Sequence, residues 1–189
     1  MTSKSLLESL NPKGHLEIIK RHSNGFEETV LEDHNVITVG MGITLAHLFS
    51  ASSSSIPSDD YKIAYFQIGT GSSTMVSSVT KLHTPISAAN YGETDLTISA
   101  IDIATETVVK PVAYINPSYI NKSSTTKVTY SLVLEEEACA SIAIKEIGLY
   151  SKNPAQQGSG LAYLCCYRSF AAITKTDAFA LIFKWTLEF

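Results

Sequence analysis

Charged side chains are scarce in this sequence. Asp, Glu, Lys and Arg make up 17% of the 189 residues, whereas roughly 25% is usual in soluble domains. The net charge is −4, and the Lys and Arg residues are scattered along the chain. A nucleic-acid-binding surface requires clustered basic residues, so we expect no nucleic-acid partner. Ser and Thr are abundant instead, a composition that suits a protein whose surface is largely covered by other subunits.

Long apolar runs are also missing. No run approaches the ~18 residues of a membrane-spanning helix, so we expect no membrane partner. Residues 1–17 lack the uninterrupted apolar stretch of a signal peptide, and we expect synthesis in a cytoplasm. Cysteine is limited to Cys139, Cys165 and Cys166, all in apolar stretches. Their number is odd and two are adjacent, which predicts buried, reduced thiols.

No catalytic or ligand-binding motif is recognisable. Catalysis requires acids, bases or nucleophiles within hydrogen-bonding reach of one another. The five histidines lie within the first 83 residues, without the spacings of metal or nucleophile motifs. The glycine-rich stretch at residues 69–74 lacks the Lys of a phosphate-binding loop. We therefore assign no catalytic, cofactor-binding or metal-binding residues, and we expect a non-enzymatic protein without a cofactor.

The clearest positive pattern is the alternation in residues 178–189, AFALIFKWTLEF. Every odd position from Phe179 to Phe189 is apolar, whereas Lys184, Thr186 and Glu188 are polar. A period of two predicts a β-strand with one apolar face. Such a face must be buried against another sheet or another subunit, because exposing it to water is costly.

Similar runs indicate a mainly β fold. Strand-like patterns occur at residues 61–68, 107–115, 124–134, 139–150 and 161–170. Short strands at this spacing predict an antiparallel β-sandwich, with barrel-like closure as the alternative. We expect residues 14–189 to form a single domain, and residues 1–13 to form an arm that becomes ordered only against a neighbour.

Residues 14–34 predict an N-terminal β-hairpin, because Asn24-Gly25 separates two strand-like runs. A two-residue loop at Asn24-Gly25 predicts the opposed pairs Arg21–Glu28, Ile19–Val30, Glu17–Glu32 and His15–His34. Like charges directly opposite each other are unfavourable. Either a bulge offsets the register, or the His/Glu cluster holds a cation.

Further local patterns predict a helix, an edge strand and a bulge. Residues 39–50 have the apolar spacing of a helix, with Thr38 as the N-cap and despite Gly40 and Gly42. Pro111 places the strand at 107–115 at a sheet edge, where strand addition from a partner is a further option. The apolar phase slips at Lys145-Glu146, which predicts a bulge.

Several segments occur in an order that resembles a group of small structural proteins of tailed bacteriophages. They are NVITVGMGITLAHLF (35–49), FQIGTG (66–71), IKEIGLYS (144–151), YRSF (167–170) followed by ITKT (173–176), and LIFKWTLEF (181–189). The Ser-rich stretch at 51–60 departs from the pattern. The group's role is architectural, in the tail, baseplate, neck or fibre-attachment region of the particle.

The resemblance implies a virion protein, made in the host cytoplasm, that forms a homo-oligomer and binds other virion structural proteins. It implies no catalytic residues. Arg168, in the YRSF segment, is expected to form a structural ion pair with a carboxylate such as Glu146. A second function stays open, because Tyr91, Tyr114 and Tyr119 in the loops suit a lectin-like, receptor-binding module for host-surface glycan. Surface tyrosines are equally common at protein interfaces.

Overall fold

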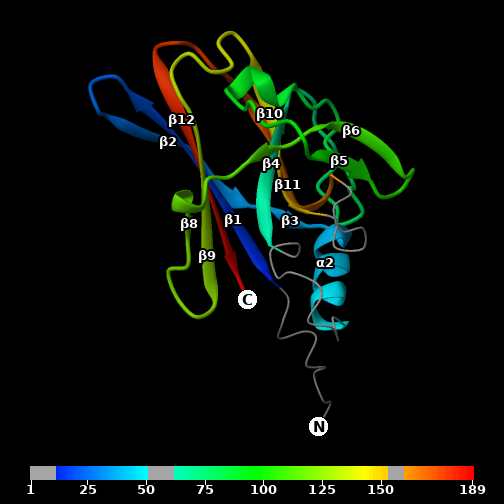
Figure 1. Ribbon diagram of the computed structural model, residues 1–189. Coiled ribbons are helices and arrows are strands. Elements are labelled where there is room, and N and C mark those ends of the chain that lie inside the picture. The colour runs from blue at the N-terminus through cyan, green and yellow to red at the C-terminus, as the bar shows by residue number, and fades with distance from the viewer. Residues whose placement is uncertain (1–11, 51–61, 153–159) are drawn as a thin grey trace.

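The computed structural model describes residues 12–50, 62–152 and 160–189, and it consists of two β-sheets that pack face to face (Figure 1). The five strands of the first sheet are β1 (Lys13–His22), β2 (Glu27–His34), β8 (Ile120–Asn121), β9 (Lys127–Leu134) and β12 (Phe179–Glu188). Their spatial order is β2-β1-β12-β9-β8. Most of the predicted N-terminal arm, residues 1–11, lies outside the described residues, and Lys13 already belongs to β1.

The second sheet has seven strands: β3 (Val36–Ile37), β4 (Ile63–Gly69), β5 (Ser99–Asp102), β6 (Thr107–Pro111), β7 (Ala113–Tyr114), β10 (Ala143–Lys152) and β11 (Leu161–Thr174). Their order is β6-β5-β11-β10-β4-β7, and β3 pairs with β11. All strand pairs are antiparallel except β5 with β11. The predicted mainly β, sandwich-like fold is therefore confirmed. The helical elements described are α2 (Val39–Ser50) and two short 3₁₀ turns, η2 (Ala88–Tyr91) and η3 (Pro117–Tyr119).

Strand β12 lies at the centre of the first sheet, between β1 and β9. Its apolar face is buried as predicted, and Phe183 and Trp185 are each only 1% exposed. This face packs against β4 and β10 of the second sheet, through side chains such as Phe66 and Ile147. The partner of the aromatic face is therefore the other sheet of the same chain, which excludes this face as a subunit contact. Only Phe189, just beyond the strand, is substantially exposed.

The N-terminal hairpin has a three-residue loop, Ser23 to Gly25, in place of the predicted two-residue loop. The backbone N–H of His22 donates to Phe26 (2.9 Å), and Gly25 adopts a φ of +83°. A turn that ends in a left-handed glycine is the usual three-residue solution for a hairpin. The prediction missed the extra loop residue because Asn-Gly is also the commonest two-residue loop.

The predicted bulge in the hairpin is present, but it lies between the loop and the like-charged pairs. It therefore does not move these pairs out of register. The register shifts between Ile18 and Ile19, so the predicted pairs Arg21–Glu28 and Ile19–Val30 are wrong. The observed pairs there are Arg21–Glu27 and Ile19–Thr29. Beyond the shift, Glu17 still faces Glu32 and His15 still faces His34. Lys184 on β12 lies opposite Glu17, with 3.9 Å between Nζ and Oε2, and this cation offsets the repulsion between the two glutamates.

Helix α2 begins at Val39 and ends at Ser50, as predicted, and it packs against β11 (Figure 1). Thr38 precedes the helix, but its hydroxyl donates to the carbonyl of Leu164 on β11. The predicted N-cap residue thus fastens the start of the helix to the sheet. Gly40 permits the same close approach, because a Cβ on it would lie 2.0 Å from the carbonyl oxygen of Leu164.

The stretch 107–115, predicted as one edge strand, forms two strands at opposite edges of the second sheet. Strand β6 pairs with β5 at one edge and β7 pairs with β4 at the other, although Val112 alone separates them. The sheet therefore curls into a half-barrel. The Gln67 side chain of β4 donates across the interior to the carbonyls of Lys110 (2.9 Å) and Pro111 (3.3 Å). Pro111 does lie at a sheet edge, as predicted.

The ladder between β10 and β11 is irregular where the bulge was predicted, between Ile144 and Glu146, but the extra residues lie on β11, where residues 170–172 stand opposite Lys145 alone. Strand β10 itself starts at Ala143, four residues later than predicted, because residues 139–142 form a turn in which Cys139 and Ser141 have positive φ. At this irregularity the alternation of side chains along β10 shifts by one residue. Ile144 and Ile147 consequently both face the core between the sheets, and Glu146 points to the opposite face.

The two glycines of α2 provide a matched test of how the helix is packed. Gly40→Ala is expected to lower the free energy of unfolding by about 1–3 kcal/mol, because the methyl group clashes with the Leu164 carbonyl. Gly42→Ala meets no atom within 4 Å and is expected to raise it by about 0.5–1 kcal/mol through helix propensity. Urea denaturation of both variants is the measurement, and equal effects at the two positions would contradict the described packing.

Asp102, at the end of β5, predicts a pH dependence of stability. Burial raises the pKa of this carboxyl, but hydrogen bonds from Thr80, Lys81, Thr105 and Ala104 outweigh burial and lower the pKa to about 2. Since the folded-state pKa lies below the ordinary value of 3.8, the stabilisation is complete above about pH 4 and is lost as the pH falls to about 2. Thermal melts from pH 5 to 2 should show this loss in the unchanged protein. The Asp102→Asn variant should lack that part of the pH dependence, and identical pH profiles would refute the assignment.

Candidate functional site

The structure brings the three tyrosines of the glycan hypothesis together around one pocket. The pocket has a volume of about 170 Å³ and is lined by η2, β7 and η3, which carry Tyr91, Tyr114 and Tyr119, and by β4 and β9. Residues 113–119 cross from the second sheet to the first at this point, so the pocket lies at the edge of the sandwich. We call it the tyrosine pocket.

The three tyrosines contribute differently. Tyr91 is 8% exposed and its ring lies 5.3 Å from that of Phe66, so it belongs to the pocket wall. Burial raises the pKa of Tyr91. Tyr114 and Tyr119 are 42% and 49% exposed, respectively. The Tyr114 ring lies 5.7 Å from that of Tyr65, on the face of the sheet opposite Phe66 and Ala113, so it points away from the pocket. A ligand in the pocket would therefore meet the ring of Tyr119 and not that of Tyr114.

Hydrogen bonds with side chains fix the backbone at or near both exposed tyrosines. The carboxylate of Glu93 accepts hydrogen bonds from the backbone N–H groups of Tyr114 (2.9 Å) and Asp95 (2.9 Å). The side-chain oxygen of Asn116 accepts from the N–H (3.0 Å) and hydroxyl (2.8 Å) of Ser118, and thereby caps η3. Such side-chain caps fix local turns, so the pocket is formed before any ligand binds.

The β9 wall of the pocket is an exposed sheet edge. Strand β8 pairs only with Thr129 and Tyr130, whereas residues 131–133 of β9 line the pocket. Within the described parts of the chain, no further strand pairs with this side of residues 131–133. Backbone donors and acceptors of an uncovered edge are available to a ligand.

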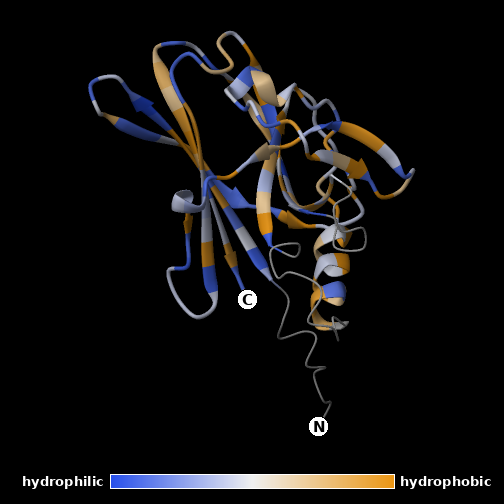
Figure 2. Cartoon of the chain, viewed as in Figure 1, coloured by the Kyte–Doolittle hydropathy of each residue, from blue (hydrophilic) through white to orange (hydrophobic). Residues whose placement is uncertain are grey.

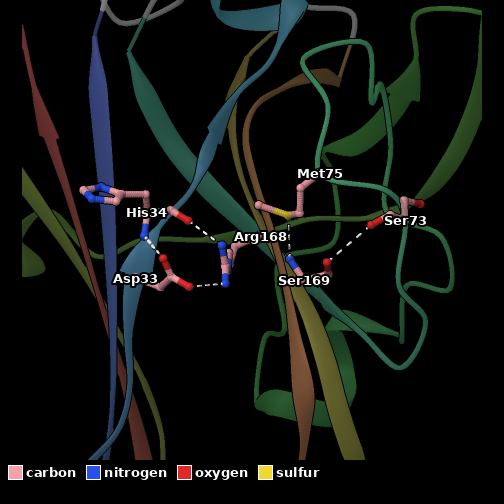
Figure 3. A network of polar contacts seen from close by, with 6 residues as sticks. All are labelled: Asp33, His34, Ser73, Met75, Arg168 and Ser169. Carbon is pink, nitrogen blue, oxygen red and sulfur yellow. Dashed lines mark hydrogen bonds and ion pairs between the residues drawn. The ribbon is translucent and has the colours of Figure 1, made fainter.

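Arg168 occupies a different place from the one predicted. It faces Ile147 in the ladder between β10 and β11, so its side chain lies on the opposite face of the sheet from Glu146. The predicted structural ion pair with a carboxylate is present, but Glu146 is the wrong partner. The guanidinium instead reaches Asp33 on β2 (2.5 Å) and the carbonyl of His34 (2.7 Å), as Figure 3 shows. Arg168 thus connects the two sheets.

The residue next to Arg168 connects β11 to the long segment between β4 and η2. The hydroxyl of Ser169 donates to the carbonyl of Ser73 (3.3 Å), and its backbone N–H approaches the Met75 sulfur at 3.3 Å (Figure 3). These neighbouring contacts hold a strand, a hairpin and a loop together. They are structural contacts, because every partner in them belongs to the same chain.

Glu146 is fully buried and accepts three hydrogen bonds. The donors are the backbone N–H groups of His83 (2.9 Å) and Thr84 (2.7 Å) and the hydroxyl of Tyr167 (3.1 Å). Gly69 leaves room for this carboxylate, since a Cβ there would lie 2.5 Å from its Oε1. Every donor that reaches Glu146 belongs to the scaffold, so this carboxylate holds residues 82–84 in place.

The remaining reactive groups are also engaged within the fold. Cys139, Cys165 and Cys166 are buried free thiols, as predicted, and burial raises the pKa of Cys139 to about 11. Lys175 is fully buried, and its ammonium donates to the carbonyls of Glu136 (2.7 Å) and Thr176 (2.6 Å). Burial lowers the pKa of Lys175. Because its pKa is raised, the Cys139 thiol is a poor nucleophile. The Lys175 ammonium, bound by two carbonyls, holds a turn in place.

The hairpin cluster shows no arrangement that requires a cation. The rings of His15 and His34 are 6.0 Å apart, and His15 Nε2 lies 3.5 Å from Glu32 Oε1. Among the described residues, no three His, Cys, Asp or Glu side chains are grouped so that they can hold a metal ion. The charges of the cluster are balanced by Lys184, as described above.

Helix α2 presents an apolar face to the solvent. Positions 39, 42, 43, 46 and 49 lie on one side of the helix, and they are Val39, Gly42, Ile43, Ala46 and Phe49. Phe49 is 79% exposed and Val39 is 45% exposed. The helix contains no Asp, Glu, Lys or Arg, and Figure 2 shows it largely in the hydrophobic and neutral colours. We call this surface the α2 face. An exposed, uncharged helix face is unusual unless a partner covers it.

Comparisons of the chain with protein-family models, with curated proteins and with solved structures give no match. Within the described part of the chain, no helix is both long enough and apolar enough to cross a membrane. The site must therefore be interpreted from its own geometry. That geometry offers two surfaces, the tyrosine pocket and the α2 face.

Proposed function

We propose that this protein is a non-enzymatic structural subunit of the virion of a tailed phage. It assembles in the tail, baseplate, neck or fibre-attachment region, as a homo-oligomer and through contacts with other virion proteins. The observation that carries the proposal is the α2 face. A side chain as large and apolar as Phe49, 79% exposed on an uncharged helix, gains free energy when another protein surface covers it.

The segments that resemble phage structural proteins support the same proposal, because their residues serve the architecture of the fold. Gly69 and Gly71 allow close contact with residues 83–84 and Glu146. Trp185 fills the core between the sheets, and Arg168 connects them. Residues that define a scaffold in this way are typical of a protein whose task is assembly.

The α2 face also explains the composition of the chain. A protein that is enclosed by other subunits requires few charges for solubility, because little of its surface meets water once assembly is complete. The low charged fraction of 17% is consistent with that arrangement. Helix α2, which carries the most exposed of the large apolar side chains among the described residues, contains no Asp, Glu, Lys or Arg.

Light scattering on the purified chain tests the proposal. The unchanged protein should have a native mass that is a discrete multiple of 20.5 kDa. Phe49→Glu should weaken self-association by at least about tenfold, because it places a charge in the buried contact. Phe26→Glu is the matched control, since Phe26 is 61% exposed on the hairpin loop, away from α2. A monomeric unchanged protein, or equal loss in both variants, would contradict assembly through the α2 face.

A further inference from the structure

We propose that the α2 face binds the α2 face of a second copy of this chain. The two helices lie side by side and antiparallel, related by a twofold axis at the level of residue 44. Val39 of each copy then lies against Phe49 of the other, and Gly42 lies against Ala46. This inference rests on the proposed function, because it names the partner that the α2 face binds in the homo-oligomer.

The first argument is the spacing of the exposed positions along α2. Four residues of the α2 face are exposed and form one stripe along the 12-residue helix, and they are Val39, Gly42, Ala46 and Phe49. They are three, four and three residues apart. This spacing is the one along which two helices pack side by side over their whole length. The stripe therefore predicts another helix as its partner.

The second argument is the distribution of large and small residues in the stripe. The two small residues, Gly42 and Ala46, lie in the middle, and the two larger ones, Val39 and Phe49, lie at the ends. Both pairs are centred on residue 44, so an antiparallel second α2 places small against small and large against large. Small residues in the middle let the two helix axes approach to about 8 Å. The stripe is thus complementary to itself, as a twofold contact requires.

The third argument is that the fold of a single chain does not explain Gly42. Gly40 has a packing reason, because the carbonyl of Leu164 leaves no room for a Cβ. A Cβ on Gly42 would meet no atom within 4 Å, although glycine inside a helix costs about 1 kcal/mol relative to alanine. Gly42 therefore leaves a space that its own chain does not fill. A second helix that packs closely at this point fills it.

Charge favours a second α2, in the antiparallel direction. Helix α2 contains no Asp, Glu, Lys or Arg, so pairing it with itself buries no unpaired charge. In an antiparallel pair, the positive N-terminal end of each helix dipole lies beside the negative C-terminal end of the other. A parallel pair would place like ends together.

Neighbouring apolar side chains enlarge the contact. A helix about 18 Å long offers by itself less than the ~800 Å² that each partner buries in a typical stable interface. Leu48 and Val76 are each 43% exposed. Val76 precedes Ser77, whose carbonyl accepts a hydrogen bond from the backbone N–H of Val39 (2.9 Å). Val76 thus adds apolar surface at the end of α2 where Phe49 of the second copy binds.

Charge pairs introduced across the contact test the arrangement, with sedimentation equilibrium as the measurement. Val39→Lys and Phe49→Glu should each weaken self-association by at least about tenfold, because each places a lone charge in the contact. An equimolar mixture of the two variants should associate at least about tenfold more tightly than either variant alone. In the mixed dimer, the new ammonium of one copy lies against the new carboxylate of the other. The double variant Val39→Lys/Phe49→Glu should recover in the same way.

A mixture of Phe49→Glu with Phe49→Lys is the matched control, because position 49 lies against position 49 only in a parallel pair. Recovery in this mixture, and none in the first, would overturn the antiparallel arrangement. If neither mixture recovers while Phe49→Glu still weakens association, α2 is not the partner, and the proposed function stands without this inference. A monomeric unchanged chain would overturn both.

Gly42→Leu tests the close approach of the two helices independently. The new side chain starts in open space on the folded chain, so thermal melts should show a Tm no lower than that of the unchanged protein. Self-association should nevertheless weaken by at least about tenfold, because the larger side chain separates the helices. Undiminished association of this variant would contradict the proposed contact. Circular dichroism of every variant excludes unfolding as the cause of lost association.

Discussion

The buried carboxylate of Glu146 is the constraint on which much of the second sheet depends. A carboxylate without access to water must be fully hydrogen-bonded, or the fold loses several kcal/mol. Here the donors come from the long segment between β4 and η2, through His83 and Thr84, and from Tyr167 on β11. The ladder between β10 and β11 is irregular just before Glu146, and Glu146 pairs with Gly69 at the end of β4, so this carboxylate lies where the connection leaves β4.

The placement of that connection shapes the half-barrel. Leu82, beside the bound backbone of His83, is fully buried in a second cluster of apolar residues together with Tyr150 and Leu164. Gly148 makes room for it, because a Cβ there would lie 2.9 Å from the Leu82 side chain. The Gln67 amide then joins β4 to β6 across the interior. The polar contacts fix positions, and the apolar side chains fill the space between them.

Periodicity in the sequence was a good guide to elements and a poor guide to partners. The alternation in β12, the helix from Val39 to Ser50 and the irregularity at Lys145 all follow from local patterns, and the structure confirms them. The partner of Arg168 depends on which face of a strand a side chain occupies after a bulge, and no local pattern encodes that. The half-barrel escaped prediction because residues 107–115 resemble one strand, and its interruption at Val112 is visible only once both edges are known.

For the candidate site, too, the sequence indicated individual residues but not how they come together. The tyrosines could be named from the sequence as loop aromatics, but their convergence depends on residues 113–119 crossing between the sheets. The α2 face was missed for another reason. The apolar spacing predicted the helix correctly. However, the side of the helix that contacts β11 includes Gly40, which has no side chain, so apolar spacing alone does not indicate which side is buried. The sequence did contain a signal, because the helix has no Asp, Glu, Lys or Arg. A helix that packs on a sheet usually carries charged residues on its outer side unless that side is also covered.

The central position of β12 has a consequence for how the chain matures. Residues 179–188 are synthesised after every other described strand, yet they lie between β1 and β9, pairing with β1 along their whole length and with β9 over residues 181–188. Until they emerge from the ribosome, the edges of β1 and β9 that face the gap are unpaired, and the core between the sheets lacks Trp185. The first sheet can therefore close only after residues 179–188 have left the ribosome, and a chain truncated before this strand keeps two unpaired strand edges. The order of synthesis thus separates full-length chains, which can close the sheet, from truncated ones, which cannot.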